Sequence, residues 1–237
     1  MYTHHKVDHE FPRGTPTTIS YMVCSVPRCG SSLLCELLCN TQLAGAPTEF
    51  FDAQLMSEFR GRWGSRSLED YLRDLLERKT SPNGVFGIKV HWGQLGNALG
   101  EADPAELFPG LRYVHMRRED RLRQAVSWVR ALQTNQWAST HELRGEPAFD
   151  AAKIALYLER IDAEESQWHA FFEHRRITPH TVTYRALVDS PQGTVRDVLA
   201  YLGVPGAAAA VCGAPTLLRQ ADVVTDEWVE RYLANRD

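Results

Sequence analysis

Long apolar runs are the first thing this sequence lacks. No stretch of the 237 residues approaches the ~18 apolar residues that a membrane-spanning helix needs. Residues 1–18 contain no apolar segment like the centre of a signal peptide. They carry instead the polar residues His4, His5, Lys6, Asp8, His9, Glu10 and Arg13. We expect no membrane association, a cytoplasmic location and a mobile leader over residues 1–18, with metal binding by its histidines as a minor alternative.

An excess of positive charge is also missing. The formal net charge is −4, so the chain as a whole has no electrostatic reason to bind nucleic acid or an anionic membrane. With 43% hydrophobic and 24% charged residues, the composition is that of an ordinary globular protein. An anionic ligand would therefore need a local pocket of arginine, lysine and backbone N–H groups.

Cysteines are few and lack the C-x-x-C spacing of many metal sites. The five cysteines are Cys24, Cys29, Cys35, Cys39 and Cys212. An odd number without a secretory signal indicates free thiols in a reducing compartment. We expect them to pack in the interior rather than to bind metal.

The apolar pattern predicts strands that alternate with helices in one domain over residues 19–237. The predicted strands are 19–25, 85–90, 111–116 and 181–184. The predicted helices are one after Gly30 and those at 68–78, 121–133, 149–174, 192–202 and 225–235. This alternation favours an α/β fold of three layers, P-loop-like, with a mostly parallel central sheet flanked by helices.

The segment Ser25-Val-Pro-Arg-Cys-Gly-Ser-Ser32 joins the first strand to a helix. Such a turn directs backbone N–H groups and the helix dipole at one place, which suits an anion. Arg28 adds a permanent charge, Gly30 permits close approach, and Ser31 and Ser32 offer hydroxyls and could cap the helix. An ordinary strand-to-helix turn with an exposed arginine is the plain alternative.

A nucleotide-binding P-loop, G-x-x-x-x-G-K-[ST], is the other alternative. Ser25 stands where the first glycine would be, and Ser31 where the lysine would be. No aspartate ends a following apolar strand to hold Mg²⁺. A kinase or NTPase is therefore the weaker interpretation, and a Mg²⁺-dependent ATP turnover would reveal it.

Two further groups of residues could carry chemistry. Arg118 lies at the carboxyl end of a predicted strand, where open α/β sheets bind ligands, and Ser127 follows in the next helix. Glu49, flanked by two phenylalanines, should be partly desolvated, which would raise its pKa and make it a better proton acceptor. Lys89 and His91 end a strand on the ligand side. Each has a plain alternative. Arg118 could belong to a solvated helix start and Glu49 could be an exposed loop acid, whereas Lys89 could simply pair with an acid and His91 could pack in the core.

These segments together resemble a known family. The patterns S-x-P-R-x-G-S-S, G-x-P-x-E-F-F and R-x-D-x-x-x-Q-A-x-S occur in the order found in the bacterial PAPS-dependent sulfotransferases typified by trehalose 2-sulfotransferase. The resemblance continues through Gly87-Ile-Lys-Val-His-Trp92 and ends with Arg219-Gln-Ala-Asp222 and Asp226-Glu-Trp-Val-Glu-Arg-Tyr232. It covers nearly the whole chain, from about residue 21 to residue 232.

The resemblance implies transfer of a sulfuryl group from 3′-phosphoadenylyl sulfate (PAPS), with PAP as product. By analogy with phosphoryl transfer we expect a direct in-line displacement that needs no metal, because the leaving phosphate is already well stabilised. It assigns the 5′-phosphosulfate to Pro27, Arg28, Cys29, Gly30, Ser31 and Ser32. It assigns binding of the 3′-phosphate to Arg118 and Ser127, and the role of catalytic base to Glu49. Arg219, Gln220 and Ala221 match a late loop that lies near the nucleotide in the family. From their place at a strand end, Lys89 or His91 could help to neutralise charge on the transferring group, and the turn from Arg28 to Ser32 would stabilise the leaving group. His91 stays open as the base in place of Glu49. A non-catalytic PAPS- or PAP-binding protein stays open as an alternative.

The resemblance also bears on the acceptor and the assembly. The acceptor would be a hydroxyl of a small molecule, such as a glycoside or another hydroxylated metabolite. Related enzymes can be homodimers. In the trehalose enzymes a second carboxylate precedes the base by three residues, whereas this sequence has Ala46 there. We therefore expect trehalose to be a poor acceptor. Trp92, Trp128 and Trp137 could line the acceptor or adenine site, or belong to the core.

Overall fold

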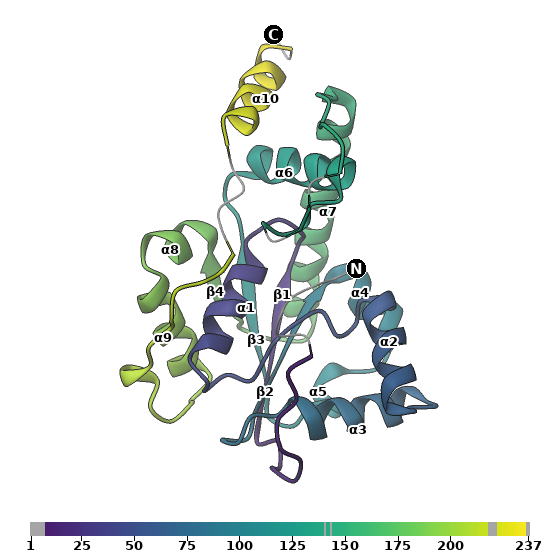
Figure 1. Ribbon diagram of the computed structural model, residues 1–237, viewed down its shortest axis with the longest axis vertical. Helices are drawn as coiled ribbons and strands as arrows, with labels where there is room; N and C mark the ends of the chain where they lie inside the picture. The colour runs from purple at the N-terminus through teal and green to yellow at the C-terminus, as the bar shows by residue number, and fades with distance from the viewer. Residues whose placement is uncertain (1–7, 140, 143, 218–221, 236–237) are drawn as a thin grey trace.

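A four-stranded sheet forms the centre of the molecule (Figure 1). The structure is a computed structural model that describes residues 8–139, 141–142, 144–217 and 222–235. The strands are β1 (Ile19–Ser25), β2 (Val85–His91), β3 (Leu111–Arg117) and β4 (His180–Thr183). Their order is β2-β1-β3-β4, and all of these neighbours pair in parallel. The four predicted strands and the parallel sheet are confirmed.

Helices cover both faces of this sheet, which gives the three expected layers (Figure 1). On one face lie α1 (Ser31–Asn40), α8 (Tyr184–Asp189) and α9 (Pro191–Tyr201), followed by the short 3-10 helix η1 (Ala207–Ala209). The other helices are α2 (Ala53–Trp63), α3 (Leu68–Lys79), α4 (Trp92–Leu99), α5 (Pro104–Leu107), α6 (Arg121–Thr134), α7 (Ala151–His174) and α10 (Val223–Ala234). In the part of the chain that the structure describes, each helix is too short or too polar to cross a bilayer.

Alternating side chains of β1 separate two hydrophobic cores. Tyr21 and Val23 pack with α1, α8 and α9, whereas Met22 and Cys24 pack with α2, α3 and α7. Successive side chains of a strand point to opposite faces, so a strand buried on both sides is apolar throughout. All five cysteines are free, and four of them are buried, as the sequence predicts.

Asp120 caps α6, but no side chain caps α1. Asp120 accepts a hydrogen bond from the Arg123 N–H, as expected of a cap. The expectation that Ser31 or Ser32 caps α1 is wrong, because Gly30 holds the cap position and no side chain caps the helix. The first N–H groups of α1 therefore have no partner within the helix.

The described part of the expected leader contacts the domain. The Phe11 N–H donates to the Arg78 carbonyl at 2.8 Å, and Glu10 accepts from Arg78 at 2.9 Å and from the Trp63 indole at 2.9 Å. The carbonyl of His9 accepts from Lys79 Nζ at 2.6 Å. Residues 8–11 thus lie along α2 and α3 rather than apart from them. The domain boundary at residue 18 stays a prediction.

Candidate functional site

The site lies at the carboxyl edge of the sheet, where the parallel register aligns the strand ends. Ser25 pairs with His91 on one side and with Met116 on the other, and Arg117 pairs with Thr183. The residues that follow these ends therefore meet at one edge of the sheet. This is the edge at which open α/β sheets bind ligands.

The loop between β1 and α1 has an unusual backbone. Arg28 has φ 68° and Gly30 has φ 96°, both in the left-handed region. A Cβ atom on Gly30 would lie 2.6 Å from Cδ2 of Tyr184, so only glycine fits. A non-glycine residue such as Arg28 adopts a positive φ at a cost of about 1 kcal/mol or more, and such strain gathers at functional loops.

Three side chains from distant elements hold the loop in place. The Trp168 indole donates to the Ser25 carbonyl at 3.1 Å, and Gln124 Nε2 donates to the Pro27 carbonyl at 2.8 Å. Arg118 Nη1 donates to the Arg28 carbonyl at 3.3 Å. Because α6 and α7 anchor the loop carbonyls, the loop is already formed before any ligand binds.

Two arginines bring positive charge to this loop. Arg28 Nε donates to Ser127 Oγ at 3.0 Å, and its Nη1 donates to the Trp137 carbonyl. Arg118 lies 4.7 Å over the ring of Tyr184, and its Nε is buried without a hydrogen-bond partner. Burial also lowers the pKa of the Arg118 guanidinium. A buried cationic N–H without an acceptor is costly, and an anionic ligand would relieve that cost.

Glu49 is the centre of a second cluster, which involves Lys89, His91 and Gln94. Its Oε1 lies 2.5 Å from Lys89 Nζ and 3.5 Å from His91 Nε2. Its Oε2 accepts from Gln94 Nε2 at 2.7 Å. Lys89 also donates to Ser32 Oγ at 2.8 Å, so one ammonium group links the carboxylate to the start of α1.

The expectation of a raised pKa at Glu49 is wrong. Glu49 is buried, as its phenylalanine neighbours predict, and burial alone would raise its pKa. Lys89 and His91 outweigh that effect and hold the pKa of Glu49 well below its ordinary value. Glu49 is therefore a carboxylate at neutral pH, and Lys89 is its partner.

A cavity of about 500 Å³ joins the two clusters. Ten of the predicted site residues line it: Pro27, Arg28, Gly30, Ser31, Ser32, Glu49, Lys89, His91, Arg118 and Ser127. The side chain of Cys29 packs in the core instead. Arg219, Gln220 and Ala221 lie outside the described residues. Trp128 and Trp137 line the cavity, whereas Trp92 packs against Trp168 and Phe171.

Sequence reasoning missed two side chains that shape the site. Gln94 orients Glu49. It was missed because α4 starts directly after β2, with no turn residues that would indicate the start of a helix. Tyr184 stacks on Arg118 and lines the cavity. Its signal was present, because Tyr184 ends a predicted strand at the ligand edge of the sheet.

A segment late in the chain completes the wall of the cavity. The buried carboxylate of Glu36, on α1, accepts from the Thr216 N–H at 2.7 Å, from Thr216 Oγ1 at 2.7 Å and from the Leu217 N–H at 3.1 Å. Leu217 lines the cavity, as does Pro215. One side chain thus fixes the approach of residues 215–217 to the site.

The parallel sheet and the strand–loop–helix unit at its carboxyl edge define an α/β protein of the P-loop-like class. Within that class the assignment is specific, because the family model described as Stf0 sulphotransferase matches residues 20–235. The chain belongs to the Stf0 sulphotransferase family, and it is a sulfotransferase.

Two curated relatives support this assignment. Proteins named trehalose 2-sulfotransferase from Mycobacterium tuberculosis and Mycolicibacterium smegmatis are each 31% identical to this chain, over 256 and 255 residues. Each alignment covers 90% of this chain and 94% of the relative. A crystal structure of a sulfotransferase from Alicyclobacillus acidocaldarius covers 94% of this chain and 92% of its own at 15% identity, with a TM-score of 0.48. An overlap that weak does not bear on the assignment.

Proposed function

We propose that this sulfotransferase uses PAPS as donor and transfers its sulfuryl group to a hydroxyl of a small-molecule acceptor, releasing PAP. The observation that carries the proposal is the buried Nε of Arg118, which has no partner and lies beside the cavity. A 3′-phosphate distinguishes PAPS from a simpler adenylyl sulfate. Arg118 and Ser127 would hold that phosphate, and Arg28 of the loop donates to Ser127 Oγ beside it.

The rest of the cavity fits the donor's second anionic group. The uncapped N-terminus of α1 offers backbone N–H groups at the loop, and Ser31 and Ser32 stand in its first turn. Arg28 and Lys89 lie on either side. These groups would hold the phosphosulfate and stabilise the charge that develops on the leaving phosphate.

The reaction we propose is an in-line displacement. The acceptor oxygen forms a bond to sulfur while the bond from sulfur to the bridging oxygen breaks, and PAP leaves with the electron pair. Glu49 takes the acceptor's proton. A carboxylate with a depressed pKa is a weak base, but it is ionised at neutral pH. A loose transition state needs little proton transfer until the acceptor's new bond has acidified its hydroxyl.

Lys89 has a part that follows from its position. It bridges Glu49 and Ser32, so it stands between the base and the donor loop. We infer that Lys89 neutralises charge on the transferring group, and that His91 supports the same carboxylate. The free cysteines support a cytoplasmic location, and a homodimer stays a prediction.

We propose that the acceptor is not trehalose, the sugar that the names of the curated relatives contain. Ala46 is buried, and because it is an alanine no carboxylate reaches the cavity from this position. A sugar hydroxyl directed at this point would find no carboxylate, and an unpaired buried hydroxyl is costly. The wall between α1 and α8 is apolar, formed by Leu33, Leu37, Leu187 and Val188. We propose a glycoside or hydroxylated metabolite with an apolar part, and we expect trehalose to be a poor acceptor.

The experiment that tests the proposal is incubation of the protein with PAPS and a panel of hydroxylated metabolites, trehalose included. Mass spectrometry should detect PAP and an acceptor that has gained one sulfuryl group. The reaction should proceed in EDTA. ATP turnover that requires Mg²⁺, without use of PAPS, would contradict the proposal. Efficient sulfation of trehalose would contradict only the acceptor assignment.

A further inference from the structure

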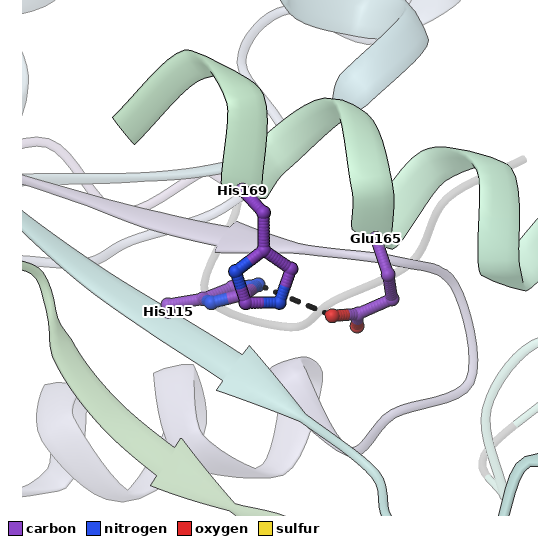
Figure 2. A group of neighbouring side chains, drawn as sticks. All are labelled: His115, Glu165 and His169. Carbon is purple, nitrogen blue, oxygen red and sulfur yellow. Dashed lines mark ion pairs between the residues drawn. The ribbon is translucent and has the colours of Figure 1, made fainter. Parts of the chain in front are cut away.

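Three potential metal ligands lie together on the α7 side of the sheet (Figure 2). His115 comes from β3, and Glu165 and His169 come from α7, where a spacing of four residues places them on one face of the helix. Their ligand atoms all lie within 4.8 Å of one another. None of the three is among the described residues that line the reaction cavity.

His115 supplies a polar atom that needs a partner. The residue is only 1% exposed, and its Nε2 is buried without a hydrogen bond. The nearest acceptor, Glu165 Oε2, is 3.5 Å away, which is beyond the range of a good N–H···O bond. The fold thus holds an imidazole nitrogen in an ion-pair contact of 3.5 Å with a carboxylate, close to a second imidazole.

That separation suits a metal ion. Zinc binds nitrogen and carboxylate ligands at about 2.0–2.1 Å in tetrahedral sites, so its ligand atoms lie roughly 3.4 Å from one another. The 3.5 Å between His115 Nε2 and Glu165 Oε2 is close to that spacing. His169 is exposed, so its ring has room to move from its present position, within 4.8 Å of the other ligand atoms, to the shorter spacing that a metal requires.

We propose that His115 Nε2, a ring nitrogen of His169 and the carboxylate of Glu165 form a binding site for a divalent transition metal ion of the zinc type, with water as the fourth ligand. Two nitrogens and one carboxylate oxygen are a donor set that zinc commonly takes. The site lies apart from the sulfuryl-transfer cavity, so the metal takes no part in that reaction.

Arg117 is a built-in competitor for this site. Its Nε donates to Glu165 Oε2 at 2.9 Å, and its side chain is 34% exposed. A bound dication would repel this guanidinium, which can turn toward solvent. Arg117 therefore weakens the site without being one of its ligands.

The metal would also stabilise the loop of the reaction site indirectly, through α7. Trp168, which lies between the two α7 ligands in the sequence, donates its indole N–H to the Ser25 carbonyl at the end of β1. A metal that joins β3 to α7 would fix that anchor. The expected result is a metal-dependent gain in stability, with sulfuryl transfer still running in EDTA.

The test uses the whole chain after EDTA treatment and dialysis. It is titrated with Zn²⁺ and monitored by calorimetry, and it is titrated with Co²⁺ and monitored by the visible absorption bands of a tetrahedral complex. Both are measured at pH 7.5, and thermal unfolding is recorded with and without Zn²⁺. We expect one equivalent to bind and to raise the melting temperature. His169→Ala, an exposed position that leaves folding intact, should weaken binding at least about 10-fold, and Glu165→Gln should do the same.

Three controls make the outcome decisive. His174→Ala, at the exposed end of the same helix, should bind as the parent does. Replacing His4, His5 and His9 by alanine should also change nothing, and Arg117→Gln should tighten binding. The proposal is overturned if the parent binds no metal, if His169→Ala keeps the parent's affinity, or if the leader variant loses the site. Unchanged affinity in Arg117→Gln would count against ligation by Glu165.

Discussion

The guanidinium of Arg118 illustrates how one buried charge can select a ligand. Its Nε has no partner, and it stacks on Tyr184 beside the loop that carries Arg28. Loss of a charge-assisted hydrogen bond costs about 1.5–3 kcal/mol, or roughly 10- to 150-fold in affinity. We expect Arg118→Ala to weaken PAP binding by that factor in calorimetry. AMP, which lacks the 3′-phosphate, should lose much less, because Arg118→Ala costs it only the hydrogen bond that holds the Arg28 carbonyl of the loop.

The matched control is Arg121→Ala, because Arg121 pairs with Asp162 on the surface and does not line the cavity. It should leave both ligands unaffected. Equal losses of PAP and AMP in Arg118→Ala would contradict the assignment of the 3′-phosphate to this residue.

Glu49 leads to a prediction about pH as well as about substitution. Since Lys89 and His91 hold its pKa well below 4.5, the carboxylate stays ionised as the pH falls from 7 to 5. We expect kcat to stay level over that range on the acidic side. Glu49→Gln, which cannot take a proton, should lower kcat by about 10²–10⁴-fold and leave PAP affinity unchanged.

Two measurements separate the base from its neighbours. A fall in kcat through pH 6.5, the range in which imidazoles ordinarily protonate, would indicate a histidine base instead. Because Glu49→Gln leaves the buried Lys89 without its carboxylate, thermal unfolding must accompany the kinetics. A folded variant with near-normal kcat would remove Glu49 from the mechanism.

At the scale of single elements, the turn from β1 to α1 depends on one glycine. Gly30 combines φ 96° with a contact that a Cβ would make at 2.6 Å from Tyr184. Gly30→Ala should therefore displace Tyr184 or the loop and lower PAP affinity at least about 10-fold. Gly96→Ala is the control, because Gly96 lies in α4 and a Cβ there would meet no atom within 4 Å. It should stabilise the fold by about 0.5–1 kcal/mol. Equal PAP affinity in the two variants would refute this account of the loop.

The elements predictable from the sequence were those with clear punctuation. β1 has the predicted bounds because Pro27 and Gly30 follow it. α3 begins at the predicted residue because Ser67 and Asp70 form a capping box, and it ends one residue later than predicted. The helices α2, α4, α5 and α8 were not predicted. α4 and α8 each begin at the residue after a strand, so no turn residues separate the two elements.

The candidate site was predictable in its residues but not in its electrostatics. The loop, Arg118, Ser127 and Glu49 all face one cavity, since parallel strands end at the same edge. The neighbours Phe50 and Phe51 indicated correctly that Glu49 is buried. The sign of its pKa shift depends on Lys89 and His91, forty residues further along the chain, and local sequence cannot show that contact.

On the scale of the whole molecule, Lys79 links stability to pH. It is 1% exposed and lies over the rings of Phe59 and Trp63, and burial lowers its pKa from 10.5 to about 8. Below pH 8 the lysine is charged in both the folded and the unfolded protein, and the cost of burying that charge is fully present. Between pH 8 and 10.5 the folded protein has released the proton, whereas the unfolded chain still binds it. Stability contributed by this group therefore rises with pH across that window.

Urea unfolding of the parent and of Lys79→Met at pH 7.5 and 9.5 measures this effect. The free energy of unfolding of the parent, relative to the variant, should increase at the higher pH. Lys153→Met, at an exposed position, is the control and should show no such change. A difference between parent and Lys79→Met that is the same at both pH values would contradict the shift.

The hydrogen bonds of Glu36 to Thr216 and Leu217 join positions that are 180 and 181 residues apart. Closing so long a loop has an entropic cost that only the finished sheet can offset, so this contact forms among the last. During synthesis the strands and the loop after β1 leave the ribosome well before residues 215–217 do. A nascent chain can therefore assemble its sheet while the cavity still lacks the wall that Pro215 and Leu217 supply, and the cavity is completed only after these residues have left the ribosome.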